Sequence, residues 1–152
     1  MAVAARTGRS SPCVFCALVA GEGPAAVVLN DDGFLGFLDR RPLFVGHTLL
    51  VPKVHHETLT DLPPDLVGPL FARARLLAGV METELGSEGS FVAINNRVSQ
   101  SVAHLHVHVV PRTKGDGLRG FFWPRTTYAD DEEMAAIATR IRAALEREPA
   151  DG

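Results

Sequence analysis

The chain has 152 residues and a formal net charge of −3, with 46% hydrophobic and 22% charged residues. This length predicts one globular domain with a real core, and the small charge gives no general attraction to nucleic acid or to a membrane surface. No apolar run approaches the roughly 18 residues that span a bilayer, and the N-terminus lacks the apolar core of a secretory signal, so we expect a cytoplasmic protein.

The N-terminal segment leads to a pair of cysteines. Residues 1–12 are small, polar and basic and predict a disordered tail. Cys13 and Cys16 then form a single Cys-x-x-Cys pair, for which a structural disulfide is not expected in a reducing compartment. The pair alone leaves a redox role, a metal site and a chance pair open, and a zinc site would need two more ligands.

Three short β-strands are predicted in the first half of the chain. Residues 25–29 and 34–39 flank Asn-Asp-Asp-Gly, a turn sequence typical of a β-hairpin, and a third strand is predicted at 47–52. By position alone, Asp39 and His47 would be ordinary polar residues at strand ends. Because these strands are local and antiparallel, an antiparallel sheet is favoured over βαβ units.

Two helices are predicted, one on each side of the histidine-rich stretch. Apolar residues recur at helical spacing between Leu66 and Met81, which predicts a helix at 65–85 with Gly86 as its C-cap. A second helix is predicted at 131–147, where Asp130 and Glu133 have the spacing of a capping box. Residues 148–152 would be a C-terminal tail.

His104, His106 and His108 alternate with apolar residues in the sequence His-Leu-His-Val-His-Val-Val. Alternation predicts a half-buried strand, which follows another predicted at 90–95, with all three imidazoles on one face and the apolar residues on the other. Two uses compete for such a face. One is metal binding, and the other is phosphate chemistry, in which one imidazole attacks phosphorus and another stabilises the charged oxygens.

This strand and its flanks resemble the histidine triad (HIT) family of nucleotide hydrolases and transferases, whose signature is His-x-His-x-His followed by two apolar residues. Residues 104–110 fit that signature, and the resemblance extends over about 13–125 through Asp39, His47 and Val51-Pro52-Lys53. It implies an α+β fold with a five-stranded antiparallel sheet and two main helices in a single HIT domain at 13–147. It also implies a homodimer in which two sheets join into one of ten strands.

The resemblance implies cleavage at the α-phosphate of a purine nucleotide conjugate through a nucleotidyl-histidine, with release of a nucleoside monophosphate. His106 would be the nucleophile, and its other ring nitrogen would bond to the backbone carbonyl of His104. His108 would bind the α-phosphate oxygens, and no metal would be required at phosphorus. The further catalytic candidates are His47, which would support the nucleophile, and Gln100 and Ser101, which would hold phosphate and leaving-group oxygens.

The same resemblance predicts how the nucleotide is held. Asp39 would bind the ribose hydroxyls, and Phe37 and Leu38 would form a wall of the base pocket. The remaining nucleotide-binding candidates are Asn95, Ser99, Gln100, Ser101, His106 and His108. The loop at 96–99 is shorter than is usual in the family and has Ser99 where the family has glycine.

In some bacterial members of the family, two N-terminal cysteines and two histidines hold a structural zinc ion. The corresponding residues here are Cys13, Cys16, His55 and His104. Two other interpretations stay open, a metal-dependent hydrolase that uses the three triad histidines as ligands and a non-catalytic nucleotide-binding or scaffold protein. The sequence also does not separate a nucleoside phosphoramidase from a dinucleoside polyphosphate hydrolase.

Overall fold

A computed structural model describes residues 12–119 and 125–147. The predicted tails therefore lie outside the described residues, apart from Pro12. The chain divides into two compact units, one that ends at Lys114 and one that begins at Gly115, and each is described by itself. In the described ranges, no helix has the length and apolar character that crossing a membrane requires.

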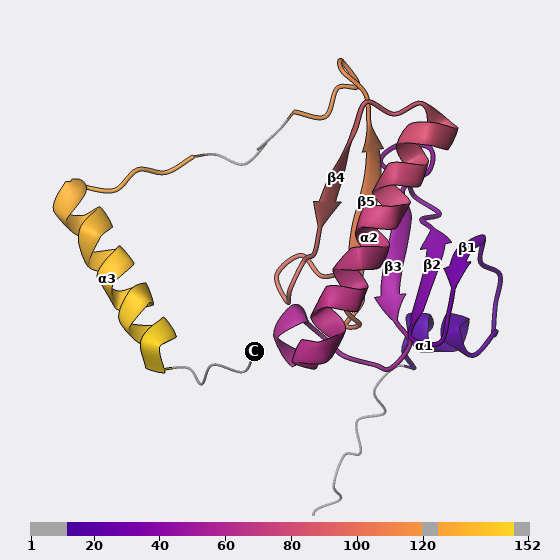
Figure 1. The fold of residues 1–152 in the computed structure, drawn as a ribbon, viewed down its shortest axis with the longest axis horizontal. Helices are drawn as coiled ribbons and strands as arrows, with labels where there is room; N and C mark the ends of the chain where they lie inside the picture. The colour runs from indigo at the N-terminus through magenta and orange to yellow at the C-terminus, as the bar shows by residue number, and fades with distance from the viewer. Residues whose placement is uncertain (1–11, 120–124, 148–152) are drawn as a thin grey trace, which may run out of the picture. The chain divides into compact units, whose positions relative to one another are not determined.

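One five-stranded antiparallel sheet forms the base of the first unit (Figure 1). Its strands are β1 (Val27–Asn30), β2 (Phe34–Leu38), β3 (Thr48–Pro52), β4 (Gly89–Ala93) and β5 (Val107–Arg112). They lie in the order β1-β2-β3-β5-β4, with every neighbouring pair antiparallel. The predicted α+β class and five-stranded antiparallel sheet are confirmed, and the strand that carries His108 lies inside the sheet with partners on both sides.

The helices are α1 (Val14–Val19), α2 (Pro64–Leu85) and α3 (Asp131–Arg147), with a short 3₁₀ turn at Leu59–Asp61. The two predicted helices are confirmed, and Gly86 caps α2 in the left-handed conformation with φ 65°. In the second unit, Asp130 accepts from the Glu133 amide, but the Glu133 carboxylate accepts from Ala129, one residue before the expected cap. The six-residue α1 was not predicted, because so short a segment shows no helical periodicity.

Apolar side chains pack on both faces of the sheet. On one face, Leu105, Val107 and Val109 are fully buried in a core that includes Leu70 and Leu77 of α2. On the other face, Phe15 of α1 packs with apolar residues of β2 and β3. The predicted apolar face of the histidine stretch is therefore confirmed, and it leaves the histidines on the α1 side.

The strand predicted to begin at His104 begins at Val107. Continued by two residues, the register of β3 and β5 would place Pro52 opposite Leu105, and proline has no amide hydrogen with which to continue the ladder. The Leu105 amide instead donates to the His56 carbonyl at 2.7 Å, and the Pro52 carbonyl accepts from the His104 ring at 2.8 Å. The first two histidines thus lie in an irregular segment that enters the strand.

Candidate active site and metal centre

The irregular segment and β5 bring the triad rings together against α1. The His106 ring lies 5.0 Å from the His108 ring between centroids, and Phe15 packs edge-on against His106 at 5.2 Å and His104 at 5.9 Å. His104 and His106 are almost fully buried. Sequence reasoning missed Phe15, although an apolar aromatic between two cysteines was a signal that this segment packs inward.

Backbone geometry determines which nitrogen of His106 carries the proton. Nδ1 of His106 lies 2.8 Å from the carbonyl oxygen of His104. A carbonyl can only accept, so Nδ1 carries the hydrogen and donates. In the neutral ring Nε2 then has a free lone pair, and it is the nitrogen that can act as a nucleophile.

A second chain of hydrogen bonds sets the proton on His108. The Leu43 amide donates to His47 Nδ1 at 3.1 Å, so Nε2 of neutral His47 carries the hydrogen and donates to His108 Nδ1 at 3.0 Å. Nε2 of His108 must then be protonated, and this buried nitrogen has no partner among the described residues. A buried donor without a partner is costly, and an anionic oxygen placed there would satisfy it.

Burial keeps these two rings neutral. It lowers the pKa of His47, while the nearby Asp39 carboxylate, 3.8 Å from His47 Nε2, acts in the opposite direction. Burial also lowers the pKa of His108 to about 4, and the proximity of His106 and His47 adds to the effect. Protonation of His108 would put a hydrogen on Nδ1, which could then no longer accept from His47. This chain of hydrogen bonds therefore requires neutral rings.

The depressed pKa of His108 predicts a pH dependence of stability. The group has a pKa of 6.5 when unperturbed and about 4 in the folded protein, so between these values the unfolded chain binds more protons. The free energy of unfolding should therefore fall as the pH is lowered from 6.5 toward 4. Urea unfolding at a series of pH values measures the free energy of unfolding of wild type and of His108→Gln. The slope of this free energy against pH should differ between the two proteins in the acidic range, and the difference should disappear above pH 7. Equal slopes over the acidic range would contradict the prediction.

A cleft of about 790 Å³ opens between α1 and the strands β2 and β3, and its lining includes Phe15, which packs against His104 and His106. Its lining is mostly apolar, with Asp39 and Arg40 as its charged members. The lining residues are Val14, Phe15, Leu18, Pro24, Ala25, Ala26, Phe37, Leu38, Asp39, Arg40 and Leu49. The structure thus places the predicted Phe37, Leu38 and Asp39 in one cleft and adds α1 as its second wall.

The loop between β4 and β5 is held by its own side chains. The Gln100 amide accepts from the Arg97 amide at 2.8 Å and donates to the Glu57 carbonyl at 2.6 Å. Both ends of the amide group are therefore engaged with backbone in this structure. Arg97 and Ser99 adopt left-handed φ values of 66° and 60°, and the other predicted loop contacts, Asn95, Ser99 and Ser101, are exposed to solvent.

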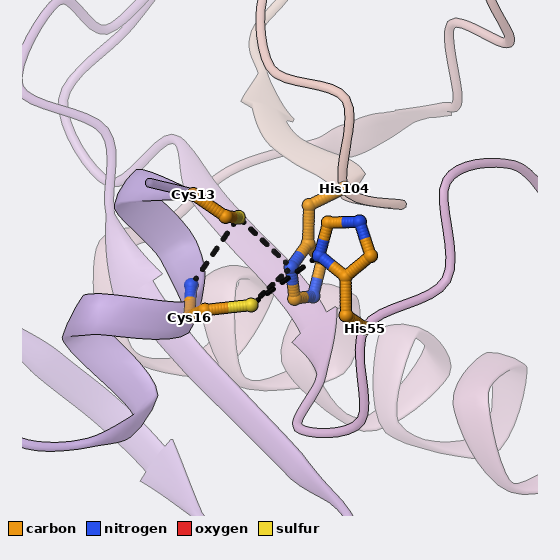
Figure 2. Close-up of side chains that lie close together, drawn as sticks. All are labelled: Cys13, Cys16, His55 and His104. Carbon is orange, nitrogen blue, oxygen red and sulfur yellow. Dashed lines mark hydrogen bonds between the residues drawn. The ribbon is translucent and has the colours of Figure 1, made fainter. Parts of the chain in front are cut away.

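Cys13 and Cys16, at the start of α1, lie close to His55 and His104 (Figure 2). Nδ1 of His104 lies 3.4 Å from Cys13 Sγ and 3.6 Å from Cys16 Sγ. Nδ1 of His55 lies 3.3 Å from Cys16 Sγ. All four atoms lie within 4.8 Å of one another, which is the arrangement that a single tetrahedral ion requires.

The donor set fits zinc. Because His104 Nε2 donates to the Pro52 carbonyl, its Nδ1 has the lone pair that points toward the sulfurs. Two thiols and two imidazoles are a common structural zinc set. Among the described residues, His108 falls in a separate group with His47 and Asp39, and His106 belongs to neither group.

A HIT-domain family model matches residues 20–115. The chain belongs to the HIT family. An uncharacterised HIT-like protein of Mycobacterium tuberculosis is 37% identical over 144 residues, which are 91% of this chain and 96% of that protein. The crystal structure of a zinc-bound histidine triad family protein from Mycobacterium smegmatis is similar, with a TM-score of 0.68, 39% identity and coverage of 87% of this chain and 97% of that one.

Two relatives in the HIT family are named for an activity. Adenylylsulfatase HINT3 of Arabidopsis thaliana is 35% identical over 108 residues, which are 70% of this chain but only 55% of that protein. Adenosine 5′-monophosphoramidase HNT1 of Candida albicans is 27% identical over 139 residues, which are 88% of this chain and 91% of that protein. Both names describe the activity of those two relatives on adenosine compounds.

Proposed function

We propose that this HIT protein cleaves purine nucleotide conjugates at the α-phosphate through a covalent nucleotidyl intermediate on His106. The observation that carries the proposal is the hydrogen bond from His106 Nδ1 to the His104 carbonyl, which leaves Nε2 with a lone pair in a buried site. Covalent catalysis divides one difficult displacement into two easier ones. The names of the two relatives, an adenylylsulfatase and an adenosine 5′-monophosphoramidase, support this reaction class.

In the first step, Nε2 of His106 forms a bond to the α-phosphorus while the bond to the leaving group breaks. The leaving group departs with the bonding electron pair and takes a proton from solvent. The ring becomes cationic, and the His104 carbonyl stabilises the charge through Nδ1. His108 Nε2–H, buried without a partner among the described groups, donates to a non-bridging phosphate oxygen. In the second step, water attacks phosphorus and gives up a proton to solvent, while the N–P bond breaks and its electron pair returns to His106 Nε2. A nucleoside monophosphate leaves with neutral His106 restored.

The cleft beside the triad provides a place for the nucleoside. Asp39 lies at the triad end of this lining, 3.8 Å from His47 Nε2, where its carboxylate would accept hydrogen bonds from the ribose hydroxyls. The apolar walls around Phe15 and Phe37 would hold the base by stacking and burial. The candidate metal ligands among the described residues fall into two groups, one with His104 and one with His108, and His106 belongs to neither. This separation also favours His106 as a nucleophile.

The proposal is tested by trapping the intermediate. We expect α-³²P-labelled adenosine phosphoramidate, adenosine phosphosulfate or diadenosine polyphosphate to label the protein in a rapid quench with alkaline detergent, because a phosphoramidate bond is lost in acid. Labelled protein should appear before free monophosphate, and the labelling should survive EDTA. Circular dichroism recorded in parallel detects any unfolding caused by loss of zinc. Binding without label or turnover on any substrate would support the scaffold alternative, and turnover lost to EDTA in a folded protein would support a metal-dependent hydrolase.

We also propose that Cys13, Cys16, His55 and His104 hold one structural zinc ion. The four ligand atoms and their spacing support it, as does the zinc-bound neighbour of known structure. The cytoplasm, where we expect the protein, keeps both thiols reduced and available. With its Nδ1 on the ion, the His104 side chain takes no part in the reaction, and its contribution to catalysis is the backbone carbonyl that holds His106.

The homodimer also stays a proposal, and β4 supports it. β4 is an edge strand, and α2, which packs against it, exposes 58% of Leu76 and 46% of Val80. Pairing of two β4 strands would extend the sheet to ten strands and cover these side chains. We expect light scattering to give the mass of two chains and Val80→Glu to give that of one, because a buried charge without a partner is costly. Val45→Glu, at a residue 86% exposed, is the control, and a dimeric Val80→Glu protein would contradict this interface.

A further inference from the structure

The cleft contains a cation that the proposed chemistry does not use. Arg40 lines it together with apolar residues and Asp39. Its Nη2 donates to the Pro24 carbonyl at 3.0 Å, and Pro24 is itself part of the lining. The guanidinium is therefore anchored at the rim of the cleft on the side of the segment that leads into β1.

Asp39 and Arg40 are consecutive, but their side chains have different partners. The Asp39 carboxylate lies beside His47, which leads to His108 and the proposed phosphate position. The Arg40 side chain reaches Pro24, in a segment held to the end of β2 by the hydrogen bond from the Leu38 amide to the Ala26 carbonyl at 3.0 Å. A nucleotide with its phosphate at the triad and its ribose at Asp39 would therefore present its base to Arg40.

The guanidinium has hydrogen-bonding capacity left for a ligand. It carries five N–H donors, of which one is engaged by Pro24. Among the described residues, the ion pairs within 4.0 Å do not include Arg40. A planar fork of donors is suited to two adjacent acceptors in one plane. A 6-oxopurine offers such a pair in O6 and N7, whereas adenine has an amino donor in place of O6.

We infer that Arg40 recognises the base and that this site prefers 6-oxopurine nucleotides, guanine or hypoxanthine, over adenine nucleotides. The inference rests on the proposed function, because it assumes that the cleft holds the nucleoside of the substrate. The inferred base preference differs from the preference for adenine that the names of two relatives suggest. Arg40 would act on affinity and KM rather than on the chemical step, since it lies away from the triad end of the lining.

The test compares four ligands by isothermal titration calorimetry on the full-length zinc-loaded protein: GMP, IMP, AMP and 7-deaza-GMP. We expect GMP and IMP to bind at least about fivefold more tightly than AMP, the lower end of what a bidentate arginine–guanine contact provides. Loss of the N7 acceptor should weaken 7-deaza-GMP relative to GMP. In Arg40→Met, which keeps the length of the side chain, the preference should fall to about one while AMP affinity changes little.

Arg41→Met is the matched control, because Arg41 is the neighbouring exposed arginine and is absent from the lining. It should keep the wild-type preference. Equal affinity of wild type for GMP and AMP, or an unchanged preference in Arg40→Met, would overturn the inference and leave the proposed function intact. An equal loss for all four ligands in Arg40→Met would also overturn it, since stacking or general charge attraction would then be the cause. Failure of wild type to bind any of the four would instead count against the proposed function.

Discussion

His106→Ala should reduce kcat/KM for the best substrate by roughly 10⁴-fold or more, an effect of the size seen when a covalent nucleophile is removed. The reason is that His106 Nε2 is the nitrogen left unprotonated by the bond to the His104 carbonyl, and the neighbouring ring cannot replace it. Nε2 of His108 carries a hydrogen because its Nδ1 accepts from His47. The measurement is initial-rate kinetics together with the labelling assay, in which the variant should show no labelled protein.

Two controls separate loss of the nucleophile from loss of the fold. His56→Ala alters a histidine whose backbone carbonyl holds Leu105 and should keep turnover within a few-fold of wild type. Free imidazole should restore part of the turnover of His106→Ala, because truncation opens a space beside Phe15 where a small nucleophile fits. If His106→Ala kept activity within tenfold of wild type, the assignment of His106 as nucleophile would be wrong.

His55→Ala should abolish binding of the proposed zinc ion and with it a large part of the stability. Its ring is exposed while its Nδ1 lies 3.3 Å from Cys16 Sγ, so the substitution deletes a ligand with little damage to the core. A bound ion contributes about 3–4 kcal/mol to the free energy of unfolding when its free concentration is 100 to 1,000 times its dissociation constant. Zinc content by mass spectrometry and urea unfolding measure the two effects, with about one ion per chain expected in wild type.

Loss of the ion should also weaken nucleotide binding. A six-residue helix is not stable alone, and Cys13 and Cys16 at its start tie α1 to His55 and His104. Without that tie, Phe15 and its neighbours would no longer form a fixed wall of the cleft. His56→Ala is again the control and should keep the ion. Wild-type zinc content and stability in His55→Ala would exclude His55 as a ligand.

The features predicted from sequence are those that depend on neighbours along the chain. Alternation identified the buried face of Leu105, Val107 and Val109. Helical spacing together with Gly86 located the C-terminal end of α2. The β1–β2 hairpin follows from its turn, where the Asp31 carboxylate accepts from the amides of Gly33 and Phe34. The HIT signature likewise needed only consecutive residues, because it consists of side chains on one short segment.

Only the tertiary structure decided what the histidines can do. The proton positions on His108 and His104 depend on His47 and Pro52, 61 and 52 residues away along the chain. Contacts between distant segments likewise decide three other features. They are the cleft wall formed by α1, the start of β5 only at Val107, and the hydrogen bond from Gln100 to the Glu57 carbonyl. In a neutral imidazole either ring nitrogen can carry the hydrogen until a partner selects one. Sequence alone therefore determined that histidines gather here, and packing determined which nitrogen of each ring carries a hydrogen or a lone pair.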